Sequence, residues 1–214
     1  MHIEVLVEDS SGARLMTHLL PKFLGEQGEP HTWRIHNYKG IGRIPKNMTI
    51  KSDPVKKTLL ENLRKALEGY GRTPGYDAVF VLVDTDDRHV AQFKQELETL
   101  VQKCQHPPRT AFGLATEEVE AWYLGDRPAL TKAYPKADAK ILKRYVQDSV
   151  CGTWELLAEA LVKGGTAAIK AEGWRRAGDL KHEWAEKIGP LMDINKNSSP
   201  SFCIARDNLT GLTT

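Results

Sequence analysis

An uninterrupted apolar run ends abruptly in acidic residues near the middle of the chain. It covers Val79 to Val83 and contains β-branched, aromatic and aliphatic residues with no polar alternation. This pattern is typical of a strand covered on both faces, as in a parallel sheet between helices. Asp84, Asp86 and Asp87 follow at once. Crowded carboxylates repel each other unless a positive charge neutralises them, so these acids are either solvated or placed to meet a cation.

Strand and helix patterns alternate around this run. Expected strands cover residues 3–7, 31–38, 79–83 and 109–116, and expected helices cover residues 12–24, 53–67, 89–104 and 117–125. Ser10 or Ser11 can cap the first helix, while Asp53 and Pro54 suit the cap and first turn of the second. The alternation predicts an α/β fold with a mostly parallel sheet flanked by helices.

The strand patterns stop near residue 126. Helical patterns follow over residues 142–146, 154–161 and 180–191. Ser199 and Pro200 are a typical cap and first-turn residue for a last helix. We therefore expect an α/β domain over residues 1–125 and a helical C-terminal extension over residues 126–214.

Composition narrows the classes of protein. Among 214 residues, 30 Lys and Arg nearly balance 28 Asp and Glu, so net charge gives no general basis for binding nucleic acid, although a local patch remains open. No apolar run is long enough to span a membrane, and the first strand begins too early for a signal peptide. Cys104, Cys151 and Cys203 are far apart and odd in number, which predicts a reduced, cytoplasmic protein.

Acidic residues follow three separate strands. They are Glu8 after the first strand, Asp84 and Asp86 after the third, and Glu117, Glu118 and Glu120 after the fourth. The carboxyl ends of parallel strands share one edge of the sheet, where ligands bind. We therefore expect these carboxylates to meet at that edge.

Glutamate after a first strand, in "LVED", and D-x-D after a later strand, in "VDTDD", resemble the TOPRIM domain of topoisomerases, primases and overcoming-lysogenization-defect nucleases. The chain is more closely similar to a small prokaryotic family of unknown function with a TOPRIM-like fold. That likeness is carried by "VEDSSGARLMTHLLPKFL", "LVDTDD", "ATEEVEAWYLGD" and "GDLKHEWAEKIGPLMDINKNSSPSF". One difference is Glu8-Asp9, where TOPRIM domains usually carry Glu-Gly.

The resemblance implies a metal-dependent nuclease. It implies an Mg²⁺ site, with Mn²⁺ as an alternative, formed by Glu8, Asp84 and Asp86, and a general acid/base role for Glu8. Glu117 and Glu120 are further candidate ligands, since Mg²⁺ prefers oxygen. The family likeness also implies a role in prokaryotic defence beside an ATPase partner protein.

The segment "YKGIGRIPKNMTIK" is a basic, glycine-bearing loop. Gly40 and Gly42 would let the backbone approach a phosphate, and Lys39, Arg43 and Lys46 would supply positive charge. The loop lacks the full P-loop pattern, so it predicts no nucleoside-triphosphate site. A basic loop that is only solvated is the alternative.

The acidic residues also have structural explanations. Asp86 or Asp87 can cap the helix near His89, and Glu117, Glu118 and Glu120 can complement a helix dipole. Two other functions therefore stay open: a non-catalytic interaction subunit of an ATPase complex, and a metal-dependent phosphotransfer enzyme acting on a small nucleotide. Phospho-receiver and haloacid-dehalogenase folds are disfavoured, because the first needs a Lys after the last strand and the second needs D-x-D-x-T after the first.

Overall fold

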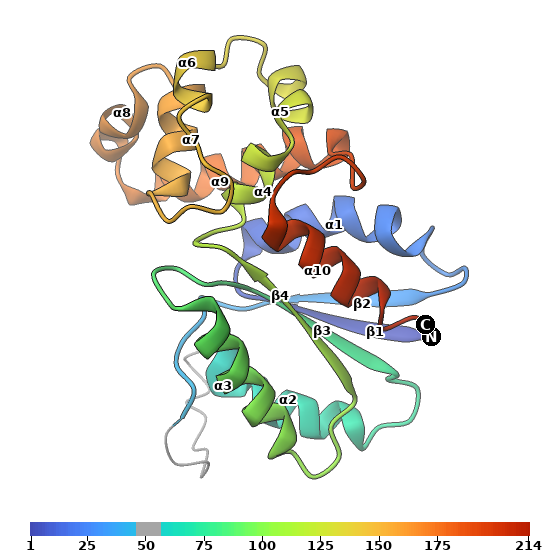
Figure 1. Cartoon of the computed structure of the whole chain (residues 1–214). Helices are drawn as coiled ribbons and strands as arrows, with labels where there is room; N and C mark the ends of the chain where they lie inside the picture. Colours follow the sequence, from blue (N-terminus) through green and yellow to red (C-terminus); the bar gives the residue numbers. More distant parts are fainter. Residues whose placement is uncertain (46–56) are drawn as a thin grey trace.

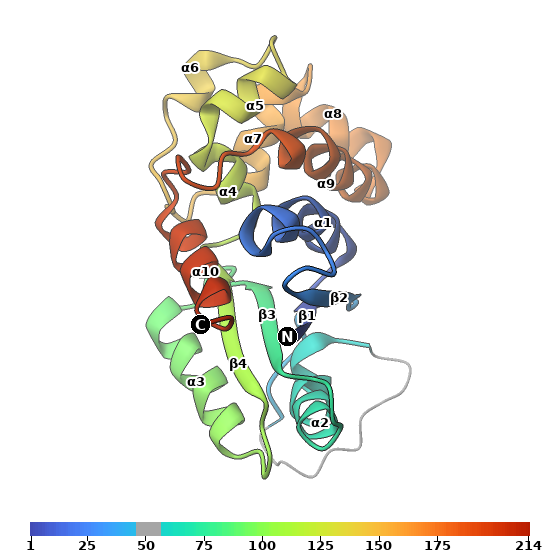
Figure 2. The same cartoon turned by 90° about the vertical axis from the view of Figure 1, so that its right-hand side faces the viewer.

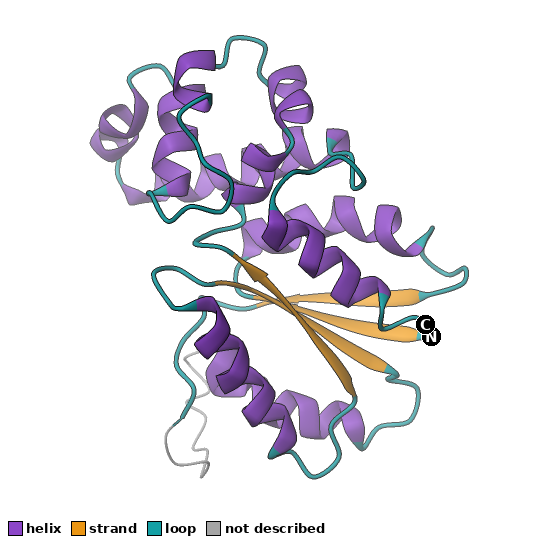
Figure 3. Cartoon of the chain, viewed as in Figure 1, coloured by secondary structure: helices purple, strands orange, loops and turns teal. Residues whose placement is uncertain are grey.

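Four parallel strands form the central layer. The computed structural model describes residues 1–45 and 57–214. Its strands are β1 (His2–Val7), β2 (Thr32–Asn37), β3 (Ala78–Asp84) and β4 (Arg109–Ala115), in the spatial order β2-β1-β3-β4. Every neighbouring pair is parallel (Figure 3), which confirms the predicted α/β class.

Helices cover both faces of the sheet. Helices α1 (Ser10–Leu24) and α10 (Pro200–Thr210) lie on one face, and α2 (Leu59–Gly71) and α3 (Val90–Gln102) lie on the other (Figures 1 and 2). In β3, Phe80 and Leu82 belong to the core under α1, whereas Val79 and Val81 belong to the core under α2 and α3. Burial on both faces is the reason why this strand has no polar alternation.

The C-terminal part adds a helical layer above α1 (Figure 1). Its elements are α4 (Glu120–Gly125), α5 (Arg127–Ala133), α6 (Ala139–Leu142), α7 (Thr153–Leu161), α8 (Gly165–Glu172), α9 (Trp174–Ile188) and the 3₁₀ turn η1 (Gly189–Leu191). Helix α9 packs on α1, and α10 returns to pack on β4. Trp184 and Phe202 share one core with Ile3 of the sheet, so residues after 125 continue the core of the α/β part.

Helix ends agree only partly with the expectations from sequence. Ser199 caps α10 by accepting a hydrogen bond from the Phe202 amide at 3.2 Å, as predicted. Asp9 caps α1 by accepting from the Gly12 amide at 2.7 Å, so the caps predicted at Ser10 or Ser11 are wrong. The reason is that the backbone leaves β1 in an extended conformation through Asp9 and enters the helix at Ser10.

Two other helices differ from their predicted ranges. Asp53 and Pro54 lie outside the described residues, and α2 begins at Leu59 after an extended Thr58. The helix predicted over residues 142–146 is wrong, because α6 ends at Leu142. Val146 is 69% exposed, so this segment lacks a continuous apolar face that could hold a helix against the core.

The contact between α10 and β4 depends on Gly113. A Cβ atom at this position would lie 2.7 Å from Cζ of Phe80 and 3.2 Å from Cβ of Ala205. We expect Gly113→Val to lower the free energy of unfolding by about 2–3 kcal/mol through overpacking. Urea unfolding measures this. Thr110→Val, on the same strand but the other face, is the control, and an equal loss in both variants would contradict the close approach.

Candidate functional site

Three strand ends bring carboxylates to one edge of the sheet. Glu8 directly follows β1, Asp84 is the last residue of β3, and Glu120 begins α4 shortly after β4. In Figure 1 these strand ends lie on the side of the sheet away from the two chain termini, close to the helical layer. The parallel topology thus gathers residues from three separate parts of the sequence, as the order of strands and acids predicted.

Glu8 and Asp84 are joined directly. The Asp84 amide donates a hydrogen bond to Oε2 of Glu8 at 3.1 Å, and Oδ1 of Asp84 accepts one from the Val119 amide at 3.0 Å. In the described part of the chain, neither carboxylate forms an ion pair with a basic side chain. The backbone fixes both groups in place, while their negative charges lack a hydrogen-bonded cationic partner.

Burial and neighbouring charges make Glu8 easy to protonate. They raise its pKa to about 7; burial contributes most, and the carboxylates of Asp86 and Asp9 add to it. The Asp84 amide and the Arg88 guanidinium act in the opposite direction. A carboxylate in this range can accept and release a proton near neutral pH.

Burial and neighbouring charges also raise the pKa values of Asp84 and Glu120. Burial raises the pKa of Asp84 well above its usual value, and the charges of Glu8 and Glu120 raise it further. Glu120 is 1% exposed, and neither of its carboxylate oxygens has a hydrogen-bond partner among the described residues. Burial, followed by the charge of Glu118, raises the pKa of Glu120 to about 7, against the opposing effect of Lys181.

A buried cation that the sequence did not predict lies at this site. The Lys181 Nζ lies 2.9 Å from Oε1 of Glu118 and 3.5 Å from Oε2 of Glu120. Burial lowers the pKa of this ammonium, but the charges of Glu120, Glu118 and Asp84 outweigh it and raise the pKa above its ordinary value. Lys181 therefore stays charged and offsets part of the acidic cluster.

Asp86 lies at the rim of the site. Its side chain is 50% exposed and binds the Arg88 guanidinium at 2.6 Å. Its backbone has a φ of 49°, a left-handed conformation that is uncommon outside glycine. Asp86 is close enough to Glu8 to raise the pKa of that group, but it faces solvent and a basic partner.

Glu117 has a structural role in the folded chain. Its carboxylate accepts hydrogen bonds from the amides of Cys151 at 3.1 Å, Gly152 at 2.8 Å and Thr153 at 3.0 Å, and from the Thr153 hydroxyl. Burial acts to raise the pKa of Glu117, but these hydrogen bonds outweigh it and lower the pKa overall. Both oxygens of Glu117 accept hydrogen bonds from the start of α7, so Glu117 is left out of the proposed metal site.

The basic loop begins beside the acidic edge. The Gly40 amide donates a hydrogen bond to the Glu8 carbonyl at 3.0 Å, and Gly40 has a φ of 92° that favours glycine. Lys39 and Arg43 are exposed, whereas Lys46 lies outside the described residues. Among the described residues, neither Lys39 nor Arg43 forms an ion pair with a carboxylate.

The described residues hold no ready-made ligand cage. Across residues 1–45 and 57–214, no group of three or more His, Cys, Asp or Glu side chains is already arranged to hold a metal ion. The cysteines Cys104, Cys151 and Cys203 are all free. The donor set at the edge is composed of carboxylate oxygens, a chemistry that suits hard cations such as Mg²⁺.

Fold and site together define an α/β protein with a buried acidic cluster at the carboxyl edge of a parallel sheet. Residues 7–203 match the model of a family described as Domain of unknown function (DUF4276), and the chain belongs to that family. No curated protein and no solved structure shows significant similarity to it. Among the helices that the structure describes, none has the length and apolar character needed to cross a membrane.

The raised pKa of Glu120 predicts a pH-dependent stability. The folded protein keeps a proton on Glu120 up to about pH 7, whereas the unfolded chain releases it near 4.5. The free energy of unfolding should therefore fall as pH rises between these values, because the folded state binds more protons. Glu120→Gln should reduce this fall by roughly 2 kcal/mol between pH 5 and pH 8, leaving the part due to Glu8.

Urea unfolding at the two pH values, in chelator, measures the effect. Glu98→Gln on α3 removes an exposed carboxylate and serves as the control, since it should leave the pH dependence unchanged. If Glu120→Gln shows the same pH dependence as the wild type, the electrostatic description of the cluster is wrong.

Proposed function

We propose that the protein is a metal-dependent nuclease that cleaves phosphodiester bonds at the carboxyl edge of its sheet. The observation that carries this proposal is the hydrogen bond from the Asp84 amide to the Glu8 carboxylate, which joins two acidic residues at the ends of neighbouring strands. Beside them lies the buried Glu120, whose oxygens have no hydrogen-bond partner among the described residues. The TOPRIM-like order of these acids along the chain supports the same reading. DNA and RNA are both compatible with it.

Mg²⁺, with Mn²⁺ as an alternative, fits the donors at this edge. Mg²⁺ commonly takes one or two carboxylates directly and keeps several waters, so Glu8 and Asp84 suffice without a cage of three. Asp86 could join them from the rim if Arg88 turned to a phosphate. When bound, the ion would polarise a phosphate oxygen and lower the pKa of a water molecule.

The chain's own groups would position and move the proton. Oε2 of Glu8 is held by the Asp84 amide, which leaves Oε1 to take a proton from an attacking water and return it to the leaving oxygen. The pKa of Glu8 is about 7 without metal, and a cation beside it would lower this value and favour the ionised form that accepts a proton. Lys181 lies between Glu118 and Glu120 and offsets one of their two negative charges, so it leaves the carboxylates of Glu8 and Asp84 without a basic partner among the described residues.

Exposed cations would bring the nucleic acid to this acidic edge. Lys39 and Arg43 lie on the loop that is hydrogen-bonded to Glu8, and Lys46 follows in the same basic segment. Their charge would offset the repulsion between the phosphate backbone and the carboxylates. An ATPase partner and a role in prokaryotic defence, both suggested by the family resemblance, complete the proposal.

One observation favours a different function. Lys181 already supplies a positive charge inside the cluster, as would be expected of an acidic edge that no longer binds metal. In that case the protein would be a non-catalytic interaction subunit of an ATPase complex. Metal binding distinguishes the two functions.

Mg²⁺ should stabilise the folded protein through Asp84. At about ten times its dissociation constant, the ion should add about 1.4 kcal/mol, because only the folded state gathers the ligands. For a chain of this size the melting temperature should rise by about 3–5 °C. Asp84→Asn keeps the oxygen that accepts from Val119 but removes a charge, so its metal-free form should melt at the same temperature or higher. It should lose most of the Mg²⁺ shift, together with cleavage.

Six melting curves test this, for wild type, Asp84→Asn and Asp87→Asn, each with Mg²⁺ and with chelator. Asp87 is an exposed acid three residues from Asp84, and its substitution should keep the shift. The metal site is refuted if the wild type shows no shift or if Asp84→Asn retains all of it. A shift without cleavage of any polynucleotide would retain the metal site but reject the nuclease, whereas the absence of any shift would favour the interaction subunit.

A further inference from the structure

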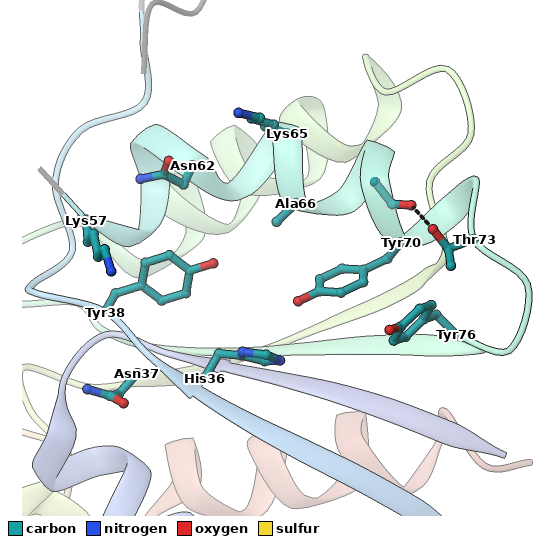
Figure 4. Close-up of a pocket in the computed structure, with 11 residues that line it drawn as sticks. His36, Asn37, Tyr38, Lys57, Asn62, Lys65, Ala66, Tyr70, Thr73 and Tyr76 are labelled. Atoms are coloured by element: carbon teal, nitrogen blue, oxygen red, sulfur yellow. Dashed lines mark hydrogen bonds between the residues drawn. The ribbon is translucent and has the colours of Figure 1, made fainter. Parts of the chain in front are cut away.

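A cavity lies beside β2, outside the acidic site. It has a volume of about 570 Å³ and lies between the edge strand β2 and helix α2 (Figure 4). Its floor includes His36, and its walls include Tyr38, Tyr70 and Tyr76. A volume of this size accommodates a small organic ligand.

The cavity exists because α2 leaves β2 uncovered. The leucines of α2 pack with Leu6 of β1 and with Val79 and Val81 of β3. On the same face of β2, Arg34 is exposed and His36 is half-buried. The outer strand therefore presents a polar surface next to a helix that packs on its neighbours.

A buried carboxylate lies under this floor. Glu4, in the middle of β1, is 1% exposed. Its oxygens pair with Nε2 of His36 and, at 3.1 Å, with Nε2 of His2. A buried carboxylate in a sheet is costly to keep and needs partners, so Glu4 fixes the orientation of the His36 ring at the cavity floor.

Three tyrosine hydroxyls converge above His36. In Figure 4 the hydroxyl groups of Tyr38 and Tyr70 point toward each other, and that of Tyr76 points toward His36. None of the three hydroxyls has a hydrogen-bond partner among the described residues. Burial, and then the charge of Glu4, raises the pKa values of Tyr38 and Tyr70, so both remain donors. The rings of Tyr70 and Tyr76 are 5.2 Å apart and form one aromatic wall.

Exposed lysines lie at the rim of this cavity, and Tyr38 links its wall to the end of β1. Lys57 and Lys65 are exposed at its rim. At its other end, the Tyr38 amide donates to the Val7 carbonyl at 2.9 Å, one residue before Glu8. A chain that crosses the acidic edge would thus reach the cavity within a short distance.

We propose that this cavity binds one nucleotide unit, with its base against the Tyr70–Tyr76 wall and its phosphate at Lys57 and Lys65. The aromatic wall matches the face of a base, and the unpaired tyrosine hydroxyls match the polar edge of that base. The lysine ammonium groups at the rim match the phosphate. This inference rests on the proposed function in one respect: the strand cut at Glu8 and Asp84 would supply the nucleotide. A base can enter the cavity only when it is unpaired, so the substrate would be single-stranded or frayed.

Binding in chelator tests the cavity separately from metal chemistry. The probes are adenosine 5′-monophosphate, an eight-residue oligoadenylate and its deoxy counterpart. Ala66 lies on α2 and faces the cavity in Figure 4, so Ala66→Trp should fill it and weaken binding at least about tenfold. Lys65→Glu, an exposed change that leaves the core intact, should weaken binding and flatten its salt dependence. Lys94→Glu on α3 is the matched control and should bind as the wild type does.

The outcomes separate this inference from the proposed function. If the protein binds oligoadenylate but not the monophosphate, the nucleotide in the cavity belongs to a strand. If it binds the monophosphate but not oligoadenylate, the ligand is a free nucleotide. Both results support a nucleotide-binding cavity. Cavity-dependent binding without metal-dependent cleavage would retain this inference and reject the nuclease. No binding by the wild type, or equal affinity for wild type, Lys65→Glu and Ala66→Trp, would overturn the inference even if cleavage occurs.

Discussion

The approach of Glu8 to Asp84 is the constraint around which the carboxyl edge is built. A parallel sheet has to bring these two strand ends together, and the Asp84 amide holds the Glu8 carboxylate at 3.1 Å. Burial of both carboxylates is the main reason why their pKa values rise, and neighbouring negative charges add to the rise. A fold that keeps this arrangement gives up stability at neutral pH unless a cation is supplied.

The helical part supplies one cation to the acidic cluster. Lys181 reaches Glu118 across 63 positions of sequence, because α9 packs on α1 above the same strand ends. Glu117 and Glu118 also bind the start of α7 through the amides of Cys151 and Trp154. These polar contacts, together with the continuous apolar core that contains Ile3 and Trp184, join the extension to the α/β part.

Local patterns in the sequence predict much of this molecule. The apolar run at Val79, the cap at Ser199 and the meeting of Glu8 with Asp84 all follow from periodicity, cap chemistry and parallel topology. The role of Glu117 does not, because it depends on a left-handed backbone and on partners that follow 34 or more positions later. In the sequence, Lys181 follows Leu180 of the apolar stripe of its helix and cannot be told from an ordinary surface lysine. The cavity beside β2 results from the packing of α2 on β1 and β3, which leaves β2 uncovered. No local sequence pattern predicts this arrangement.

Direct location of a divalent cation would test this account most directly. Mn²⁺ gives an anomalous scattering signal, and crystals equilibrated with it at pH 8 would have Glu8 mostly ionised, since its pKa is about 7. We predict an anomalous peak in contact with a carboxylate oxygen of Glu8 or Asp84 and bounded by both. Crystals at saturating Mn²⁺ with no peak between these two residues, or with peaks only elsewhere, would contradict the claim that the strand-end acids form a metal site.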